Sequence, residues 1–252
     1  MDKQSLCWLV KTGMCTLSYI PDKTQNNTFV ITSNRDESVN RSAQMPKKYD
    51  EYQTQLYYPK DKKAGGTWIG ISRMNIFMSL MNGAFHKHKR KKAYKKSRGI
   101  VLKELLSSSA IFKTIDTYDF QGIEPFFSIL VTWDTHVKIH ELVWDGTKIF
   151  LNEKDADKPH LWSSMMSYSS EQHHKKIFEF QRFLKRHKQV SPELIWDFHH
   201  IRRFKNDEGL LIDRGELQTT SISQFCHHFK NEDNFRFEDL TNHQEQNNFI
   251  AW

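Results

Sequence analysis

The sequence is poor in cysteine and contains no long apolar run. Its three cysteines, Cys7, Cys15 and Cys226, are odd in number and far apart, which speaks against a disulfide framework and a thiolate zinc site. No stretch of roughly eighteen apolar residues occurs, so the sequence predicts no membrane span. The apolar stretch at residues 7–10 is too short for the core of a signal peptide. We therefore expect a cytoplasmic protein.

An even distribution of charge is also lacking. The net charge is +7, but residues 86–98 alone hold eight Lys or Arg and no acid, so the rest of the chain carries −1. Such a run is typical of a solvated surface loop, and contact with a phosphate or an anionic substrate is the alternative. Nucleic-acid binding is disfavoured, because the run holds one tyrosine and lacks the interleaved aromatic residues on which bases stack.

Alternating apolar residues predict three β-hairpins. The first runs from Met14 through the turn at Asn26-Asn27 to Ser33, with residues 34–37 at its end. Residues 38–64 are polar and are expected to be irregular. The second hairpin covers 68–72 and 76–81, and the third covers 126–133 and 137–143, which 148–151 continues. A late strand is predicted over 217–225.

Helical spacing of apolar residues marks 99–118 and, most clearly, 169–187. A further helix begins at Ser191-Pro192-Glu193, where serine caps the helix and proline occupies its first turn. No repeat or low-complexity linker divides the chain. The pattern predicts one α+β domain over residues 14–252, with helices packed on antiparallel sheets, preceded by an extension of residues 1–13.

Cys15 and the polar residues near it have the chemistry of a nucleophilic site. A thiol attacks well only when a base takes its proton or its pKa is lowered. If the chain began at Cys15, its α-amine, with a pKa of about 7.7–8.0, would provide that base. Asp36 could orient the amine, and Asn82 could donate a hydrogen bond to an oxyanion. The pattern alone is more typical of a small core cysteine, a polar turn and a surface ion pair.

A set of motifs in a fixed order resembles the NRDE family, also known by its transport-and-Golgi-organisation member. The motifs are Met14-Cys15-Thr16, Asn34-Arg35-Asp36-Glu37, Gly65-Gly66-Thr67-Trp68-Ile69-Gly70, Leu80-Met81-Asn82 and Ser97-Arg98-Gly99. The resemblance spans about residues 14–225 and implies the fold of the N-terminal-nucleophile (Ntn) hydrolases, a four-layer αββα sandwich with two antiparallel sheets. It implies Cys15 as nucleophile, Asp36 as the partner of its amine and Asn82 near the oxyanion. The site residues implied by the resemblance are Cys15, Asn34, Arg35, Asp36, Asn82 and Ser164.

Three departures from the family pattern bear on activity. Thirteen residues precede Met14, so we expect a misplaced start or removal of this segment. Ser33 stands where the cysteine amidases of the superfamily commonly carry arginine, and Trp162-Ser163-Ser164 stands where many relatives carry Leu-Ser-Asn. Ser164 thus replaces an asparagine of the expected oxyanion site, although its hydroxyl can still donate one hydrogen bond.

Two functions remain open at this point. The first is a cysteine hydrolase that acts on a non-peptide C–N amide or a related acyl bond of a small molecule, with no cofactor. The alternative is a non-catalytic carrier that binds haem or an acyl ligand, since relatives have been linked to haem mobilisation and lipid metabolism. The histidine pairs at 173–174, 199–200 and 227–228, and His86 with His88, do not match a metal motif and are expected to have structural or surface roles. Cys226-His227 is the one pair suited to haem iron or a soft metal.

Overall fold

The first two strands form the hairpin that carries the candidate site. In the computed structural model, β1 (Met14–Pro21) pairs antiparallel with β2 (Phe29–Ser38), and Cys15 lies opposite Arg35. Because β12 (Leu217–Phe229) pairs with the other side of β2, this strand is central and is buried from Phe29 to Glu37. The structure describes residues 14–86, 88–164, 170–202, 209–229 and 232–252, and the predicted extension 1–13 lies outside them.

The strands form two antiparallel sheets. The first sheet has the order β10-β1-β2-β12-β13-β14, with β11 paired to β12. Besides β1, β2 and β12, its strands are β10 (His160–Ser163), β11 (Asp213–Arg214), β13 (Glu232–Asp239) and β14 (Gln244–Phe249). The second sheet follows chain order: β3 (Ala43–Glu51), β4 (Thr54–Asp61), β5 (Ile69–Ser72), β6 (Ile76–Asn82), β7 (Phe126–Trp133), β8 (Val137–Trp144) and β9 (Ile149–Lys154).

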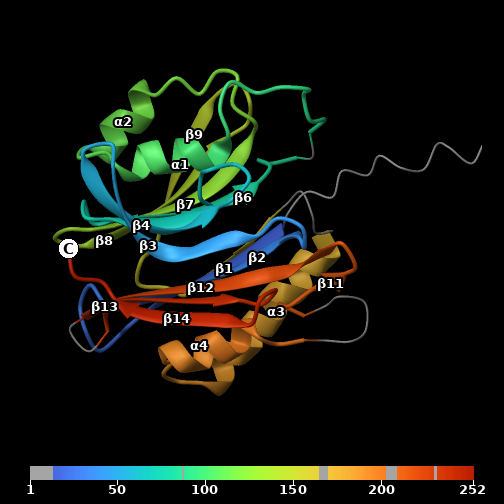
Figure 1. Cartoon of the computed structure of the whole chain (residues 1–252). Helices are drawn as coiled ribbons and strands as arrows, with labels where there is room; N and C mark the ends of the chain where they lie inside the picture. Colours follow the sequence, from blue (N-terminus) through green and yellow to red (C-terminus); the bar gives the residue numbers. More distant parts are fainter. Residues whose placement is uncertain (1–13, 87, 165–169, 203–208, 230–231) are drawn as a thin grey trace, which may run out of the picture.

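Helices cover the outer face of each sheet. α1 (Arg98–Leu106) and α2 (Ile111–Thr117) lie on the second sheet, and α3 (Ser170–Arg186) and α4 (Pro192–His199) lie on the first (Figure 1). The α4 helix begins as predicted, with Ser191 accepting a hydrogen bond from the Leu194 N–H and proline in the first turn. The four layers are therefore helices, sheet, sheet and helices, which confirms the predicted α+β sandwich.

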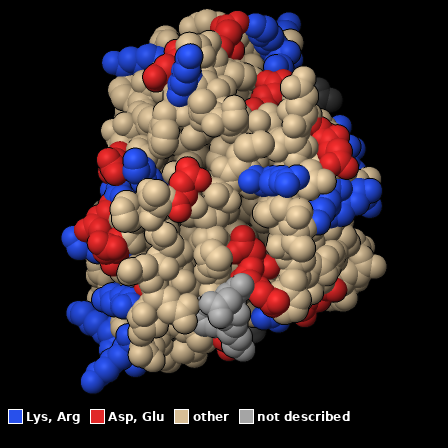
Figure 2. Space-filling model, turned by 90° about the vertical axis from the view of Figure 1, so that its left-hand side faces the viewer, with Lys and Arg blue, Asp and Glu red and all other residues tan. Residues whose placement is uncertain are grey.

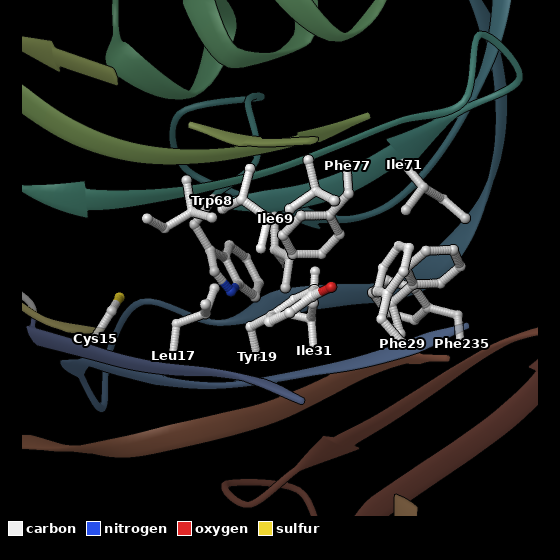
Figure 3. Packing of buried hydrophobic residues seen from close by; sticks show 14 of the residues in the cluster. Cys15, Leu17, Tyr19, Phe29, Ile31, Trp68, Ile69, Ile71, Phe77 and Phe235 are labelled. Atoms are coloured by element: carbon white, nitrogen blue, oxygen red, sulfur yellow. The ribbon is translucent and has the colours of Figure 1, made fainter. Parts of the chain in front are cut away.

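Three buried apolar clusters join these layers. The cluster between the two sheets includes Leu17, Phe29, Ile69, Phe77 and Phe235 (Figure 3). A second cluster joins α1 and α2 to the second sheet, and a third joins α3 and α4 to the first. Burial of apolar surface on both faces of each sheet explains why many strand residues are apolar without alternation.

Several predicted elements differ from those observed. Residues 38–64, expected to be irregular, contain the whole of β3 and β4. β3 is an edge strand with mostly polar, partly exposed side chains, which conceals its strand pattern. The single helix predicted over 99–118 is divided into α1 and α2. Residues 34–37 lie inside β2 rather than after it, and β10, β13 and β14 were not predicted from the sequence.

Surface charge is mixed on one face of the molecule. On the face drawn in Figure 2, lysines and arginines are interspersed with aspartates and glutamates. Within the described residues, no helix is both long and apolar enough to cross a membrane.

Candidate active site

Cys15 lies at the start of β1 and points into the space between the sheets. Its side chain continues the row formed by Leu17 and Tyr19, beside Trp68 of the facing layer (Figure 3). The residue is only 7% exposed, and it lines a pocket of about 620 Å³. The arrangement therefore gives a mostly buried thiol access to one open cavity.

The surroundings of Cys15 hold it in the thiol form. Burial, followed by the charge of Asp36, raises the thiol pKa to about 12. The positive charge of Arg35 and a hydrogen bond from the Asp36 backbone act in the opposite direction but are weaker. Because the thiolate is the nucleophile, this cysteine requires a nearby base to react at neutral pH.

Asp36 lies beside the peptide that precedes Cys15. The strand register places it opposite Met14, and its carboxylate accepts a hydrogen bond of 2.6 Å from the Thr219 hydroxyl. Asp36 lines the pocket although it is only 1% exposed. This position agrees with the expected role of orienting an amine at Cys15, and that role stays a prediction.

Arg35 connects the hairpin to the Gly65–Gly70 motif. Its guanidinium lies 4.3 Å from the centre of the Trp68 ring and forms a 2.8 Å salt bridge with Asp61. Both members of the salt bridge are about 5% exposed (Arg35 5%, Asp61 6% by side chain), and Arg41 also contacts Asp61 at 2.8 Å. Arg35 lines the pocket and binds the two sheets together.

Asn34 lies on the opposite face of β2, away from the pocket. Its amide donates to the carbonyls of His199 and Leu210, so its oxygen is the acceptor for His199 Nδ1, 2.5 Å away. His199 Nε2 then accepts from the Ser18 hydroxyl at 2.7 Å. Burial lowers the His199 pKa to about 3, with Lys176 and His200 adding to the effect, so the ring is neutral.

The series Ser18–His199–Asn34 has the order of a hydrolytic triad, but a substrate could not reach its serine. All three residues are 0% exposed, and none lines the pocket. The series instead fixes α4 to β1 and β2. His199 was predicted only as part of a structural histidine pair, and its two partners are far from it in sequence.

Asn82 and Ser164 both lie close to Cys15. The Ser164 N–H donates to the Cys15 carbonyl at 3.0 Å, and its hydroxyl donates to the Asn82 carbonyl at 2.9 Å. Asn82 lines the pocket at the end of β6. The structure thus brings Cys15, Asp36, Asn82 and Ser164 together, but the Ser164 hydroxyl is already engaged by a backbone oxygen.

Lys176 is a site neighbour that the sequence did not reveal. It lies on α3, is 3% exposed, and donates to the Thr16 hydroxyl at 2.9 Å. Burial lowers its pKa to about 8, while Asp36 and Cys15 act to raise it. Its only sequence signal is its place four residues before Phe180 on the buried side of the helix.

Gly66 and Gly99 allow the Gly65–Gly70 motif and the Ser97-Arg98-Gly99 motif to pack directly against each other. A Cβ on Gly66 would lie 2.5 Å from the backbone carbon of Gly99, a distance that two backbones cannot accommodate. The Gly65–Gly70 motif therefore packs directly on the first turn of α1. This packing holds Arg98 beside the pocket.

The basic run also borders the pocket. Arg90, Lys91 and Lys92 are exposed, as predicted, whereas the Arg98 side chain is 15% exposed and lies 3.4 Å from Glu124. All four residues line the cavity that contains Cys15. The position of these residues thus allows the alternative prediction for the basic run, contact with an anionic substrate.

The histidine pairs have hydrogen-bond partners. His173 contacts Ser163, His200 contacts Glu238, and His227 contacts Asp233. Cys226 is 4% exposed in the cluster beneath α3 and α4, so the Cys226-His227 pair offers no open site. In the described part of the chain, no group of three or more His, Cys, Asp or Glu could hold a metal ion.

Solved structures with the same fold are hydrolases of the Ntn class. A variant of the conjugated bile acid hydrolase from Clostridium perfringens matches with a TM-score of 0.57 and 10% identity, over 93% of this chain and 92% of that one. The penicillin V acylase from Agrobacterium tumefaciens matches with a TM-score of 0.54 and 10% identity, over 94% and 86%. The N-acylethanolamine-hydrolyzing acid amidase ortholog from Caenorhabditis elegans matches with a TM-score of 0.56 and 8% identity, over 83% and 92%.

Sequence comparison places the chain more narrowly than these structures do. No curated protein matches it. The model of one family matches residues 14–224, which include all six predicted site residues. The chain belongs to the Transport and Golgi organisation 2 family, the NRDE family that its motifs resemble.

Proposed function

We propose that this protein is a cysteine hydrolase that cleaves a non-peptide C–N amide or a related acyl bond of a small molecule. The observation that carries the proposal is the position of Cys15, at the start of a central hairpin and at the wall of a pocket, with Asp36 and Asn82 beside it. The names of two structural neighbours denote hydrolysis of conjugated bile acids and of N-acylethanolamines, which supports this class of substrate.

The proposed reaction begins once residues 1–14 have been removed and Cys15 carries a free α-amine. The amine takes the thiol proton, and Sγ attacks the acyl carbon. The C–N bond then breaks, the amine gives its proton to the leaving nitrogen, and a thioester with Cys15 remains. Water attacks the thioester and releases the acid. Asp36 orients the amine, and the Asn82 amide donates to the oxyanion.

The raised pKa of the Cys15 thiol favours a second function, that of a carrier. A thiol with a pKa of about 12 is unreactive at neutral pH while residues 1–14 remain attached. An acyl ligand fits this pocket better than haem does. The described lining residues include no histidine. Two lining residues have side chains able to bind haem iron: Cys15, which is held as a thiol, and Tyr94. Tyr94 already accepts a hydrogen bond from the Lys91 N–H.

A hydrolysis assay separates the two functions. Protein that begins at Cys15 is incubated with a panel of N-acyl amides, beside the same protein carrying Cys15→Ala and the chain that retains residues 1–14. Hydrolysis should fall at least about a thousandfold in both comparison proteins. Absence of turnover in the protein that begins at Cys15, with tight binding of the same amides, would favour the carrier.

A further inference from the structure

The pocket beside Cys15 has an excess of positive charge. Of the described residues that line it, eight are Lys or Arg and four are Asp or Glu. Five of the eight lie in one segment between β6 and the start of α1. We name this segment, residues 90–98, the basic wall; its charged lining residues are Arg90, Lys91, Lys92, Lys96 and Arg98.

Part of the basic wall is neutralised and anchored by acids. Glu124, whose side chain is 9% exposed, lies 3.4 Å from Arg98 and 3.7 Å from Arg90. Lys96 lies 2.7 Å from Glu104. These ion pairs fix the wall against the sandwich, so its remaining charges have a defined position at the pocket.

Three cations at the pocket are not neutralised in this way. Lys63, Lys91 and Lys92 line the cavity, and none of them forms a salt bridge with any residue in the described ranges. Uncompensated charge of one sign along a cavity wall raises the local concentration of ligands of the opposite sign. The cavity is therefore suited to an anion.

The same cavity also has apolar lining residues, which suit an apolar group. Trp68 and Leu80 line it, and they are 6% and 7% exposed. Trp68 is adjacent to Cys15 in the cluster between the sheets (Figure 3). One ligand can thus contact apolar side chains, the Cys15 thiol and the lysines of the wall at the same time.

We propose that the substrate is an acyl amide with a separate anionic group, a carboxylate, sulfonate or phosphate, which Lys91 and Lys92 bind. The acyl part contacts Trp68 and Leu80, and the carbonyl lies at Cys15. This inference rests on the proposed function for the carbonyl at Cys15, but the selection of an anion by the basic wall is independent of turnover.

Anion selection is tested without hydrolysis by measuring how probes bind to the Cys15→Ala variant of the protein that lacks residues 1–14. The probes are N-decanoylglycine and N-decanoyltaurine, which are anionic, and N-decanoylglycinamide, a neutral counterpart with the same acyl chain. Calorimetry should give affinities for the anionic probes about tenfold or more above that for the neutral one. This preference should shrink at high salt, because exposed lysines are screened.

Paired variants locate the anion. Lys91→Gln with Lys92→Gln should weaken binding of the anionic probes about tenfold and leave the neutral probe within about twofold. The matched control, Lys89→Gln with Lys113→Gln, removes the same charge from exposed positions that do not line the pocket and should change neither.

The outcomes separate this inference from the proposed function. Equal affinity for anionic and neutral probes, or equal effects of the two double variants, would overturn anion selection even if neutral amides are hydrolysed. A single-stranded oligonucleotide that binds more tightly than either anionic probe would overturn it too. Anion selection without hydrolysis of any probe by the wild-type protein that begins at Cys15 would uphold it and contradict the hydrolase.

Discussion

At the scale of single residues, Arg35 of the Asn34-Arg35-Asp36-Glu37 motif both stabilises the fold and lines the pocket beside Cys15. Its guanidinium satisfies Asp61, stacks on Trp68 and donates to the Arg41 carbonyl, so it connects three segments at the pocket wall. Residues 34–37 therefore divide into two faces: Arg35 faces the pocket, and Asn34 faces α4.

Replacement of Arg35 should be far more damaging than replacement of its neighbour Arg41. Arg35→Met leaves the buried Asp61 with one partner fewer and should lower the free energy of unfolding by about 3–5 kcal/mol. The Arg41 side chain is 37% exposed, and Arg41→Met should cost at most about 1 kcal/mol. Urea unfolding of both variants measures the two changes. Equal losses of unfolding free energy would show that the Arg35–Asp61 salt bridge stabilises the fold no more than the contacts of Arg41 do.

Residue identity could be predicted from sequence only where a motif marked it. Cys15, Asp36 and Asn82 were named from chemistry and motif order, and the structure places all three at one pocket. Lys176 and His199 could not be named, because each looks like an ordinary helix residue and finds its partners, Thr16 and Asn34, more than a hundred residues away. Only the fold supplies such contacts.

At the scale of elements, His199 fixes α4 to the hairpin through a buried polar series. The ring is neutral in the fold because burial depresses its pKa to about 3, whereas an unfolded histidine titrates near about 6.5. Between these values the unfolded chain binds a proton that the folded chain does not. Stability therefore rises with pH across this window and is lost as pH falls from about 6.5 toward 3.

The variant His199→Gln should reveal that contribution. At pH 7 it should lose about 1–3 kcal/mol, because Ser18 and Asn34 lose a well-aligned partner. As the pH falls from about 6.5 to about 4.5, the stability of His199→Gln should fall less than that of the wild type, because the variant has no histidine to protonate at this position. His200→Gln is the control, since His200 is 29% exposed by side chain. Parallel pH profiles for wild type and His199→Gln would contradict this account.

Strand prediction succeeded for hairpins rich in apolar residues and failed for several strands that carry mainly polar residues. The hairpins β5–β6 and β7–β8 are rich in apolar residues and were predicted close to their observed bounds. β3 and β14 lie at sheet edges and carry mainly polar residues, so their period of two is weak. The interval between α1 and α2 was missed because both helices have helical spacing and only a short turn separates them.

At the scale of the whole molecule, the two sheets supply different parts of the site. β1 and β2 of the first sheet carry Cys15 and Asp36, while β6 of the second ends at Asn82 (Figure 1). The basic wall follows β6 and closes the same pocket. The basic run, expected from its charge to be a surface loop, thus lines the same pocket as Cys15. Charge patterning alone could not predict this proximity.

The central claim is that Cys15 forms a covalent acyl intermediate, and intact-mass spectrometry tests it most directly. Protein that begins at Cys15 is mixed with N-decanoylglycine and quenched in acid before turnover is complete. We predict a decanoyl adduct that peptide mapping places on Cys15 and that is absent from Cys15→Ala and from the chain that retains residues 1–14. Release of decanoic acid without an adduct on Cys15, or at an equal rate by Cys15→Ala, would contradict the claim.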